Sequence, residues 1–198
     1  MRPPSLLLAL AASALTFVLP TTCSQLPLSP IPIAMSDNTF VNPLGPTLAD
    51  VLTLQQGSSI FYDYVRDLPD VVGRLTDTSG DTASTVFVPR NKAVIALARK
   101  PHLGPVEDNI EILSGREHDE RARKNVLKWI SAHIIPSHPI ELAGTHSTML
   151  EGKSITFKCE NEGERTWENC TIENGVKIVQ RLEAANGVVY VIDGVITP

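Results

Sequence analysis

The last third of the sequence limits the possible fold more than any other part. Apolar and polar residues alternate from Ile155 to Cys159, which is the period of a half-buried β-strand. Asn-Gly pairs follow at positions 174 and 186, and each is typical of a tight hairpin turn. Strands are predicted at 176–181 and 188–192, on either side of the second pair. This part of the chain is therefore predicted to form an antiparallel sheet.

The preceding residues carry helical patterns. Apolar residues recur at helical spacing after Thr47 and again from Ile60 to Leu68, which predicts two short helices before Pro69. Thr85–Pro89 is β-branched and aromatic and predicts a strand, and Asn91 is expected to cap the helix that follows it. Helices followed by antiparallel strands indicate an α+β domain.

A longer amphipathic helix is predicted before Pro136. Its apolar stripe is formed by Ala122, Val126, Trp129, Ile130 and His133. The densest basic cluster of the chain comprises Arg121, Arg123, Lys124 and Lys128. Asp119 and Glu120 are interleaved with it, which favours a solvated helix side over a phosphate-binding patch. The chain has a net charge of −5, so nucleic acid is not expected as a partner.

The first residues have the form of a secretory signal peptide. Arg2 precedes an uncharged apolar run from Leu6 to Leu19, which is too short for a confident membrane span. We predict a signal peptide at 1–24, a Pro-rich linker at 25–46 and a single domain at 47–198. An uncleaved membrane anchor is the alternative. The sequence closes on an apolar strand without a polar spacer and hydrophobic tail, so a lipid anchor is not expected.

The cysteine pattern agrees with an oxidising compartment. Cys23 would leave with the signal peptide, which leaves Cys159 and Cys170 as an even pair and predicts one disulfide. Two separate buried thiols are the alternative. Asn169 begins an Asn-Cys-Thr sequence, which is a candidate N-glycosylation site.

Two segments resemble the signature blocks of the fasciclin-like domain family: Thr85-Val86-Phe87-Val88-Pro89-Arg90-Asn91-Lys92-Ala93, and Asn186-Gly187-Val188-Val189-Tyr190-Val191-Ile192-Asp193-Gly194-Val195-Ile196-Thr197-Pro198. Between them, His133-Ile134-Ile135 stands where that family has a histidine at the end of a helix. The residues that carry the motif are Thr85, Phe87, Pro89, His133, Asn186, Gly187, Asp193 and Gly194. The resemblance covers about 47–198.

The resemblance implies a fold of two packed β-sheets with several flanking helices. It also implies a role in cell adhesion and matrix contact rather than catalysis. Many members have a tyrosine before the histidine, implicated in adhesive contacts, whereas this chain has Ala132. Adhesion through that element is therefore in doubt.

Several individual side chains are candidates for binding or catalysis. His133 on its apolar stripe favours a buried structural histidine that ties the helix to a strand, over a ligand or base. His138 and His146 are near it in sequence, but no acidic partner at ligand spacing supports a zinc site. Asp193 reads as a turn former rather than a catalytic carboxylate. Trp167 could anchor a partner or fold back onto the sheet.

Function is predicted from these residues together. The sequence has no Gly-x-Ser-x-Gly elbow, His-Glu-x-x-His pair, phosphate-binding glycine loop or dinucleotide fingerprint. We therefore expect a secreted, non-enzymatic module without a cofactor, for cell adhesion or for binding extracellular, cell-wall, matrix or membrane proteins. The alternatives are a secreted or vacuolar hydrolase that uses His133, and a glycan or lipid carrier with a sizeable apolar cavity. The vacuole lumen is the alternative location.

Overall fold

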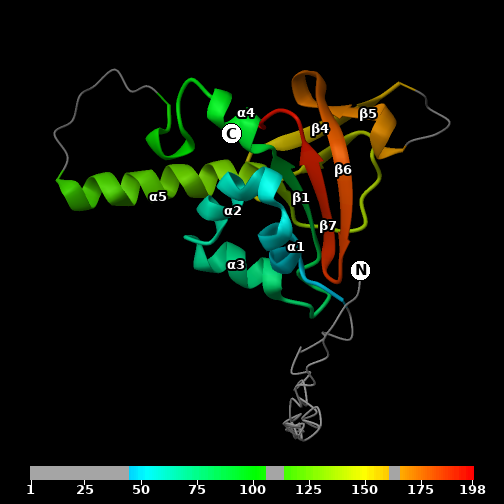
Figure 1. The fold of residues 1–198 in the computed structure, drawn as a ribbon, viewed down its shortest axis with the longest axis horizontal. Coiled ribbons are helices and arrows are strands. Elements are labelled where there is room, and N and C mark those ends of the chain that lie inside the picture. The colour runs from blue at the N-terminus through cyan, green and yellow to red at the C-terminus, as the bar shows by residue number, and fades with distance from the viewer. Residues whose placement is uncertain (1–44, 106–113, 161–165) are drawn as a thin grey trace, which may run out of the picture. The chain divides into compact units, whose positions relative to one another are not determined.

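Three helices, a strand and two further helices precede the remaining strands in the computed structural model of the protein, which describes residues 45–105, 114–160 and 166–198 (Figure 1). The α-helices are α1 (Leu48–Leu54), α2 (Ser59–Val65), α3 (Pro69–Thr76), α4 (Asn91–Ala96) and α5 (Gly115–Ala132). The strands are β1 (Ser84–Pro89), β2 (Ile134–Ile135), β3 (Thr145–Ser147), β4 (Ser154–Cys159), β5 (Cys170–Ile172), β6 (Val176–Ala184) and β7 (Gly187–Ile192). Short 3-10 turns are η1 (Gln56–Ser58), η2 (Pro101–Leu103), η3 (Trp167–Asn169) and η4 (Glu173–Gly175). The α+β class is confirmed, while the predicted signal peptide and nearly all of the predicted linker lie outside the described residues.

The strands form one mixed seven-stranded sheet in the order β2-β1-β7-β6-β5-β4-β3. β1 and β7 run parallel, with Phe87 beside Tyr190, and β2 pairs antiparallel with β1, with Ile134 beside Val86. The remaining neighbours are antiparallel. The sheet therefore brings together three segments that are far apart in the sequence and that carry the family resemblance.

Two hydrophobic clusters lie on opposite faces of the central strands. Along β7, Val189 and Val191 belong to the cluster shared with α1, α2, α3 and α5, while Val188, Tyr190 and Ile192 belong to the other. Because neighbouring strand residues point to opposite faces, a continuous apolar run suits a strand that is buried on both sides. Every residue of β1 and β7 is buried.

The second cluster is enclosed because the sheet curls back on itself. β1 and β4 are four positions apart in the strand order, which would separate them by about 19 Å in a flat sheet. The rings of Phe87 and Phe157 are nevertheless only 5.9 Å apart. The backbone N–H of Met149, after β3, donates a 2.8 Å hydrogen bond to the carbonyl oxygen of Ile134 in β2. The two packed sheets that the family resemblance implies are thus the two halves of one curled, nearly closed sheet.

Two local predictions are wrong. α2 already ends at Val65, and Pro69 does not end it but is the first residue of α3, a helix that the sequence pattern did not predict. Proline is favoured at that position since its fixed φ suits the first turn and its missing N–H has no helical partner there. Asn91 is not the cap of α4, which begins after Arg90. Its side-chain oxygen instead accepts a 2.9 Å hydrogen bond from the Ile60 N–H, so that it joins α4 to α2.

Both Asn-Gly pairs lie at hairpin turns, but their asparagine side chains have different structural roles. Asn174 and Gly175 have positive φ values of 55° and 80° in the exposed turn between β5 and β6. Asn186 precedes β7 and is buried, with its side chain turned toward the helices. The first pair therefore shapes a turn, and the second also anchors the helices to the sheet.

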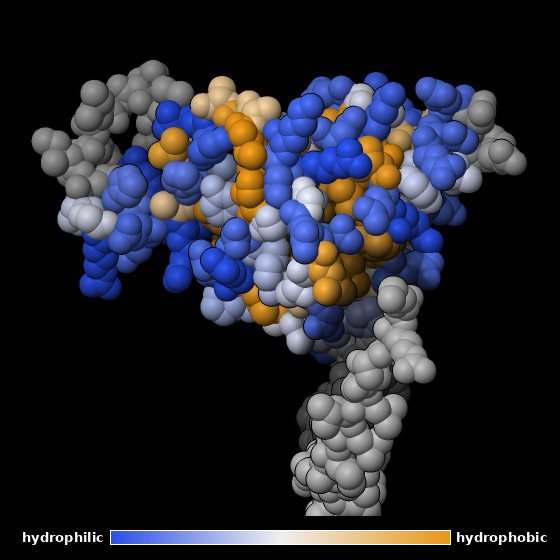
Figure 2. Space-filling model, in the orientation of Figure 1, coloured by the Kyte–Doolittle hydropathy of each residue, from blue (hydrophilic) through white to orange (hydrophobic). Residues whose placement is uncertain are grey.

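Hydrophilic side chains cover most of the face seen in Figure 2, and hydrophobic ones appear there in small separate groups. Across the three described ranges, no helix combines the length and the apolar character that crossing a bilayer requires.

Candidate functional site

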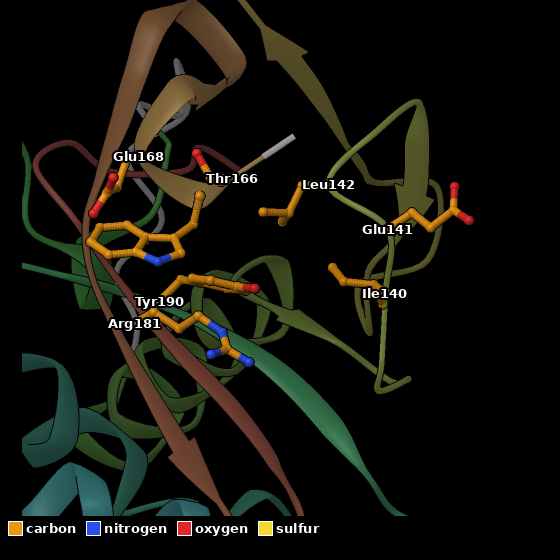
Figure 3. A pocket seen from close by; sticks show the side chains of 8 residues that line it. Ile140, Glu141, Leu142, Thr166, Glu168, Arg181 and Tyr190 are labelled. Atoms are coloured by element: carbon orange, nitrogen blue, oxygen red, sulfur yellow. The ribbon is translucent and has the colours of Figure 1, made fainter. Parts of the chain in front are cut away.

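An open cavity of about 670 Å³ lies where η3 faces strands β6 and β7 and the segment after β2 (Figure 3). We call it the Trp167 pocket. It is lined by Ile140, Glu141, Leu142, Thr166, Trp167, Glu168, Arg181 and Tyr190. Its walls combine aromatic, aliphatic and charged side chains, and its size is within the range of small-ligand sites.

The floor of the Trp167 pocket comes from the β6–β7 hairpin. Arg181 and Tyr190 are direct cross-strand partners. The Tyr190 ring is stacked on Phe87 of β1 at 5.6 Å between ring centres, so its position is set by the enclosed core. Tyr190 is 5% exposed, which leaves only the edge of this side chain to line the cavity.

Arg181 brings a charged group to this floor. Its Nη1 lies 2.7 Å from the Glu183 carboxylate. Partial burial acts to lower the pKa of Arg181, but hydrogen bonds to Glu183 and Tyr190 outweigh it and raise the pKa above its ordinary value. The guanidinium is therefore held positive and is already paired with a carboxylate.

Trp167 forms one wall and is partly buried against the core cluster that contains Tyr190. The Asn169 N–H donates to the Thr166 carbonyl and closes its turn, and the Glu160 N–H donates to the Asn169 carbonyl and joins the turn to the end of β4, each at 3.1 Å. In Figure 3 the indole lies beside Tyr190 and Arg181, and Leu142 points toward it, whereas Glu141 points away. Trp167 both folds back onto the sheet and presents a surface to the cavity.

A disulfide lies next to this wall. Cys159 and Cys170 are neighbours across β4 and β5 and are joined by a disulfide bond. The bond closes the loop that contains Trp167, and Cys170 directly follows η3. Asn169 of the Asn-Cys-Thr sequence is half-buried beside the bridge. Its glycosylation stays a prediction.

His133 lies in the interior of the domain. Its ring is fully buried, with Nδ1 2.7 Å from the Trp129 carbonyl oxygen and Nε2 3.2 Å from the Ile196 N–H. A carbonyl only accepts and an N–H only donates, so the neutral ring carries its proton on Nδ1. Its backbone carbonyl accepts from the Phe87 N–H of β1 at 2.8 Å. The residue thus joins the end of α5 to β1 and to the segment after β7.

Burial lowers the pKa of His133 to about 4, although the hydrogen bond to Trp129 acts in the opposite direction. A histidine that acts as a general base needs a ring nitrogen within hydrogen-bond reach of the proton that it removes from the reactant. Since backbone groups occupy both ring nitrogens, the geometry gives no support to a hydrolase that uses His133.

The other motif residues build the scaffold. The Thr85 hydroxyl donates to the Ser137 carbonyl at 2.9 Å, and Pro89 ends β1 opposite Ile192. The Asp193 carboxylate accepts a 2.8 Å hydrogen bond from the Lys177 N–H. Gly194 allows a close approach to Val176, whose Cγ2 would lie 2.6 Å from an added Cβ.

The remaining histidines form no metal site among the described residues, where no cluster of three or more His, Cys, Asp or Glu could hold an ion. His146 Nε2 instead lies 2.9 Å from the Glu141 carbonyl. His138 lies half-buried after β2, and burial lowers its pKa.

Sequence reasoning named Trp167 but missed Arg181, Tyr190, Ile140 and Leu142 as pocket residues. A signal for the first two was present, because a two-residue turn at 185–186 pairs Ala184 with Gly187 and hence Arg181 with Tyr190. The other two lie in an irregular segment that carries no periodic signal.

The sequence was compared with known proteins. A family model described as Fasciclin domain matches residues 56–198. A FAS1 domain-containing protein of Emericella nidulans is 30% identical over 158 residues, covering 76% of this chain and 62% of the relative. One of Aspergillus fumigatus is 34% identical over 98 residues, covering 48% and 41%. The chain thus spans less than two thirds of the length of these relatives.

A FAS1 domain pair from the insect cell adhesion molecule fasciclin I matches 71% of this chain and 45% of that one. The two are 19% identical, with a TM-score of 0.44.

Proposed function

The chain belongs to the fasciclin domain family, and we propose that it is a secreted, non-enzymatic module for cell adhesion or for binding extracellular protein and matrix. The observation that carries this proposal is the Trp167 pocket. Trp, Tyr and Arg are the residues most enriched where binding energy concentrates in interfaces. The pocket gathers one of each around a single cavity.

The surface used for binding differs from the element that the resemblance suggests. Ala132 and His133 are both fully buried. A partner could reach neither side chain without opening the core, which would cost several kcal/mol. Trp167 is the better candidate because it is partly exposed and is held in place by the turn and by the disulfide.

The extracellular setting has independent support. The predicted signal peptide at 1–24 would direct export, and a disulfide such as Cys159–Cys170 persists in oxidising compartments. Glycosylation at Asn169 would agree with the same route. The extracellular space is the proposed location and the vacuole lumen the alternative. Extracellular, cell-wall, matrix or membrane proteins are the proposed partners, without a cofactor.

Export and adhesion can be tested separately. N-terminal sequencing of protein recovered from the medium should begin near Gln25, and protein retained in the cell with Met1 intact would contradict secretion. For adhesion, intact cells of the source organism are counted on surfaces coated with the wild-type chain, Trp167→Ala or Leu54→Ala. Leu54 is 75% exposed on α1 and gives a matched apolar control.

Wild type and Leu54→Ala should retain cells equally, and Trp167→Ala should retain only the background number. Equal attachment to all three coatings would remove the Trp167 pocket from the proposal. Attachment no greater than to an albumin coating would remove the adhesive function.

A further inference from the structure

The chemistry of the Trp167 pocket indicates what it binds. We propose that it takes a neutral pyranose unit of a glycan chain, such as the sugar carried by an extracellular glycoprotein or matrix. This inference rests on the function proposed above, because it names the chemical group through which adhesion would occur.

The first argument concerns the walls of the pocket. A pyranose ring has an apolar face of C–H groups and a rim of hydroxyls, so it is recognised by a flat apolar surface with polar groups at its edge. The Trp167 indole supplies such a surface, and Leu142 points toward it from the facing segment (Figure 3). Because the hydrogen bonds of the η3 turn and the adjacent Cys159–Cys170 bond position Trp167, little conformational entropy would be lost when a ring stacks on it.

The second argument concerns hydrogen bonding. Sugar hydroxyls both donate and accept, so their site needs both kinds of group. The Arg181 guanidinium carries several N–H donors in a planar fork, and its bonds to Glu183 and Tyr190 do not use all of them. The Tyr190 hydroxyl can donate or accept, and the Glu168 carboxylate at the border of the pocket accepts.

The third argument concerns charge. Glu183 already pairs with Arg181 at 2.7 Å, while Glu168 adds negative charge at the border of the cavity. A sulfated, phosphorylated or carboxylated ligand would have to compete with Glu183 for Arg181 and approach the Glu168 carboxylate, which is unfavourable. A neutral sugar avoids both costs.

The protein contains a built-in reporter for this test. The chain has two tryptophans, and Trp129 is only 4% exposed, within the hydrophobic cluster that the sheet shares with the helices. A fluorescence change on ligand binding would therefore report Trp167. The full chain is titrated with mannohexaose, chitohexaose and laminarihexaose as neutral probes and with a heparin-derived hexasaccharide as an anionic probe, by fluorescence and calorimetry.

We expect at least one neutral probe to bind and to change the emission, and the anionic probe not to bind. Trp167→Ala should weaken binding by about tenfold or more, which corresponds to about 1.4 kcal/mol, and Arg181→Gln should also weaken it. Leu54→Ala should bind as wild type does. Unchanged melting temperatures would exclude unfolding as the cause. The proposal is overturned if no neutral probe binds at millimolar concentration, if Trp167→Ala binds equally well, or if only the anionic probe binds.

A second arm separates this inference from the proposed function. The cell-attachment assay is repeated after the cell surface has been treated with glycosidases. Loss of Trp167-dependent attachment supports the sugar proposal. Trp167-dependent attachment that survives the treatment would overturn it and leave a protein partner for the adhesion module.

Discussion

The side-chain oxygen of Asn186 accepts a 2.8 Å hydrogen bond from the backbone N–H of Leu48, so the last hairpin of the sheet holds the start of the first helix. The amide nitrogen of Asn186 donates to the carbonyls of Leu75 and Asp77, at 2.9 and 2.8 Å. One buried side chain thus connects α1, the end of α3 and the β6–β7 turn. These contacts explain why this asparagine belongs to the motif although it makes no contact with the pocket.

Replacing Asn186 by Asp should destabilise the protein. The oxygen facing Leu48 is kept, but the two donated bonds are lost and a carboxylate is placed against two carbonyls. We expect a loss of about 2 to 4 kcal/mol, measured by urea unfolding. Asn174→Asp makes the same change in the exposed Asn-Gly turn and should alter stability by less than about 0.5 kcal/mol. If the two substitutions changed the free energy of unfolding equally, the buried hydrogen bonds of Asn186 would not contribute to stability.

The buried His133 ring should make stability depend on pH. The folded-state pKa is about 4 and the ordinary value is 6.5, so between these values the unfolded state binds more protons. The contribution of the neutral His133 ring to the free energy of unfolding is therefore fully present above pH 6.5, and it is lost as the pH is lowered through this range. This single group should contribute a loss of about 2 kcal/mol between pH 7 and pH 5.

His133→Gln, which does not titrate, provides the comparison. It should lower the melting temperature at pH 7, because it breaks the fit to Trp129 and Ile196. Its stability should also decline less than that of wild type between pH 7 and pH 5. Parallel pH profiles for the two proteins would contradict the assignment of the proton to His133.

Removing the disulfide should affect both stability and the pocket. The double variant Cys159→Ser with Cys170→Ser opens a loop closed by residues 11 positions apart, and we expect a loss of about 3 kcal/mol. Trp167 lies within that loop, so ligand binding should weaken even where the variant is folded. Reductant should lower the melting temperature of wild type and leave that of the double variant unchanged. If reductant lowered the melting temperature of both proteins equally, the reducible bond would not be the one between Cys159 and Cys170.

Gly187 and Gly73 should respond to alanine in opposite directions. A Cβ on Gly187, whose φ is +152°, would collide with the Ser84 carbonyl oxygen in the neighbouring strand. Gly187→Ala should therefore cost about 2 to 4 kcal/mol or prevent folding. Gly73 is exposed within α3, and an added Cβ there has no atom within 4 Å, so Gly73→Ala should stabilise by up to about 1 kcal/mol. Thermal unfolding of both variants checks the pair.

Much of the fold is predictable because its signals are local. The strands at 176–181 and 188–192 follow from their composition and from the turn between them, and they correspond to β6 and β7. The errors are local as well. Pro69 is compatible with both the end of one helix and the start of another, and Asn91 can cap a helix or bond elsewhere. Only the surrounding structure distinguishes these uses.

The candidate site was predictable only in part. Trp167 is conspicuous in a polar segment, and the pairing of Arg181 with Tyr190 follows from the hairpin register. Leu142 has no comparable signal, because it lies in an irregular segment between β2 and β3. Its approach to Trp167 depends on the path of that segment across the curled sheet.

The sequence by itself determined the α+β class, the family motif, the turns and the even cysteine pair, since each depends on residues close together in the chain or on their order. The tertiary structure alone decided that the sheet curls, which brings Phe157 against Phe87 and encloses the second core. It also decided that Trp167, Leu142 and the Arg181–Tyr190 pair border one cavity. The physical reason is that these contacts join distant parts of the chain, so they depend on the curvature of the sheet and the packing of both its faces.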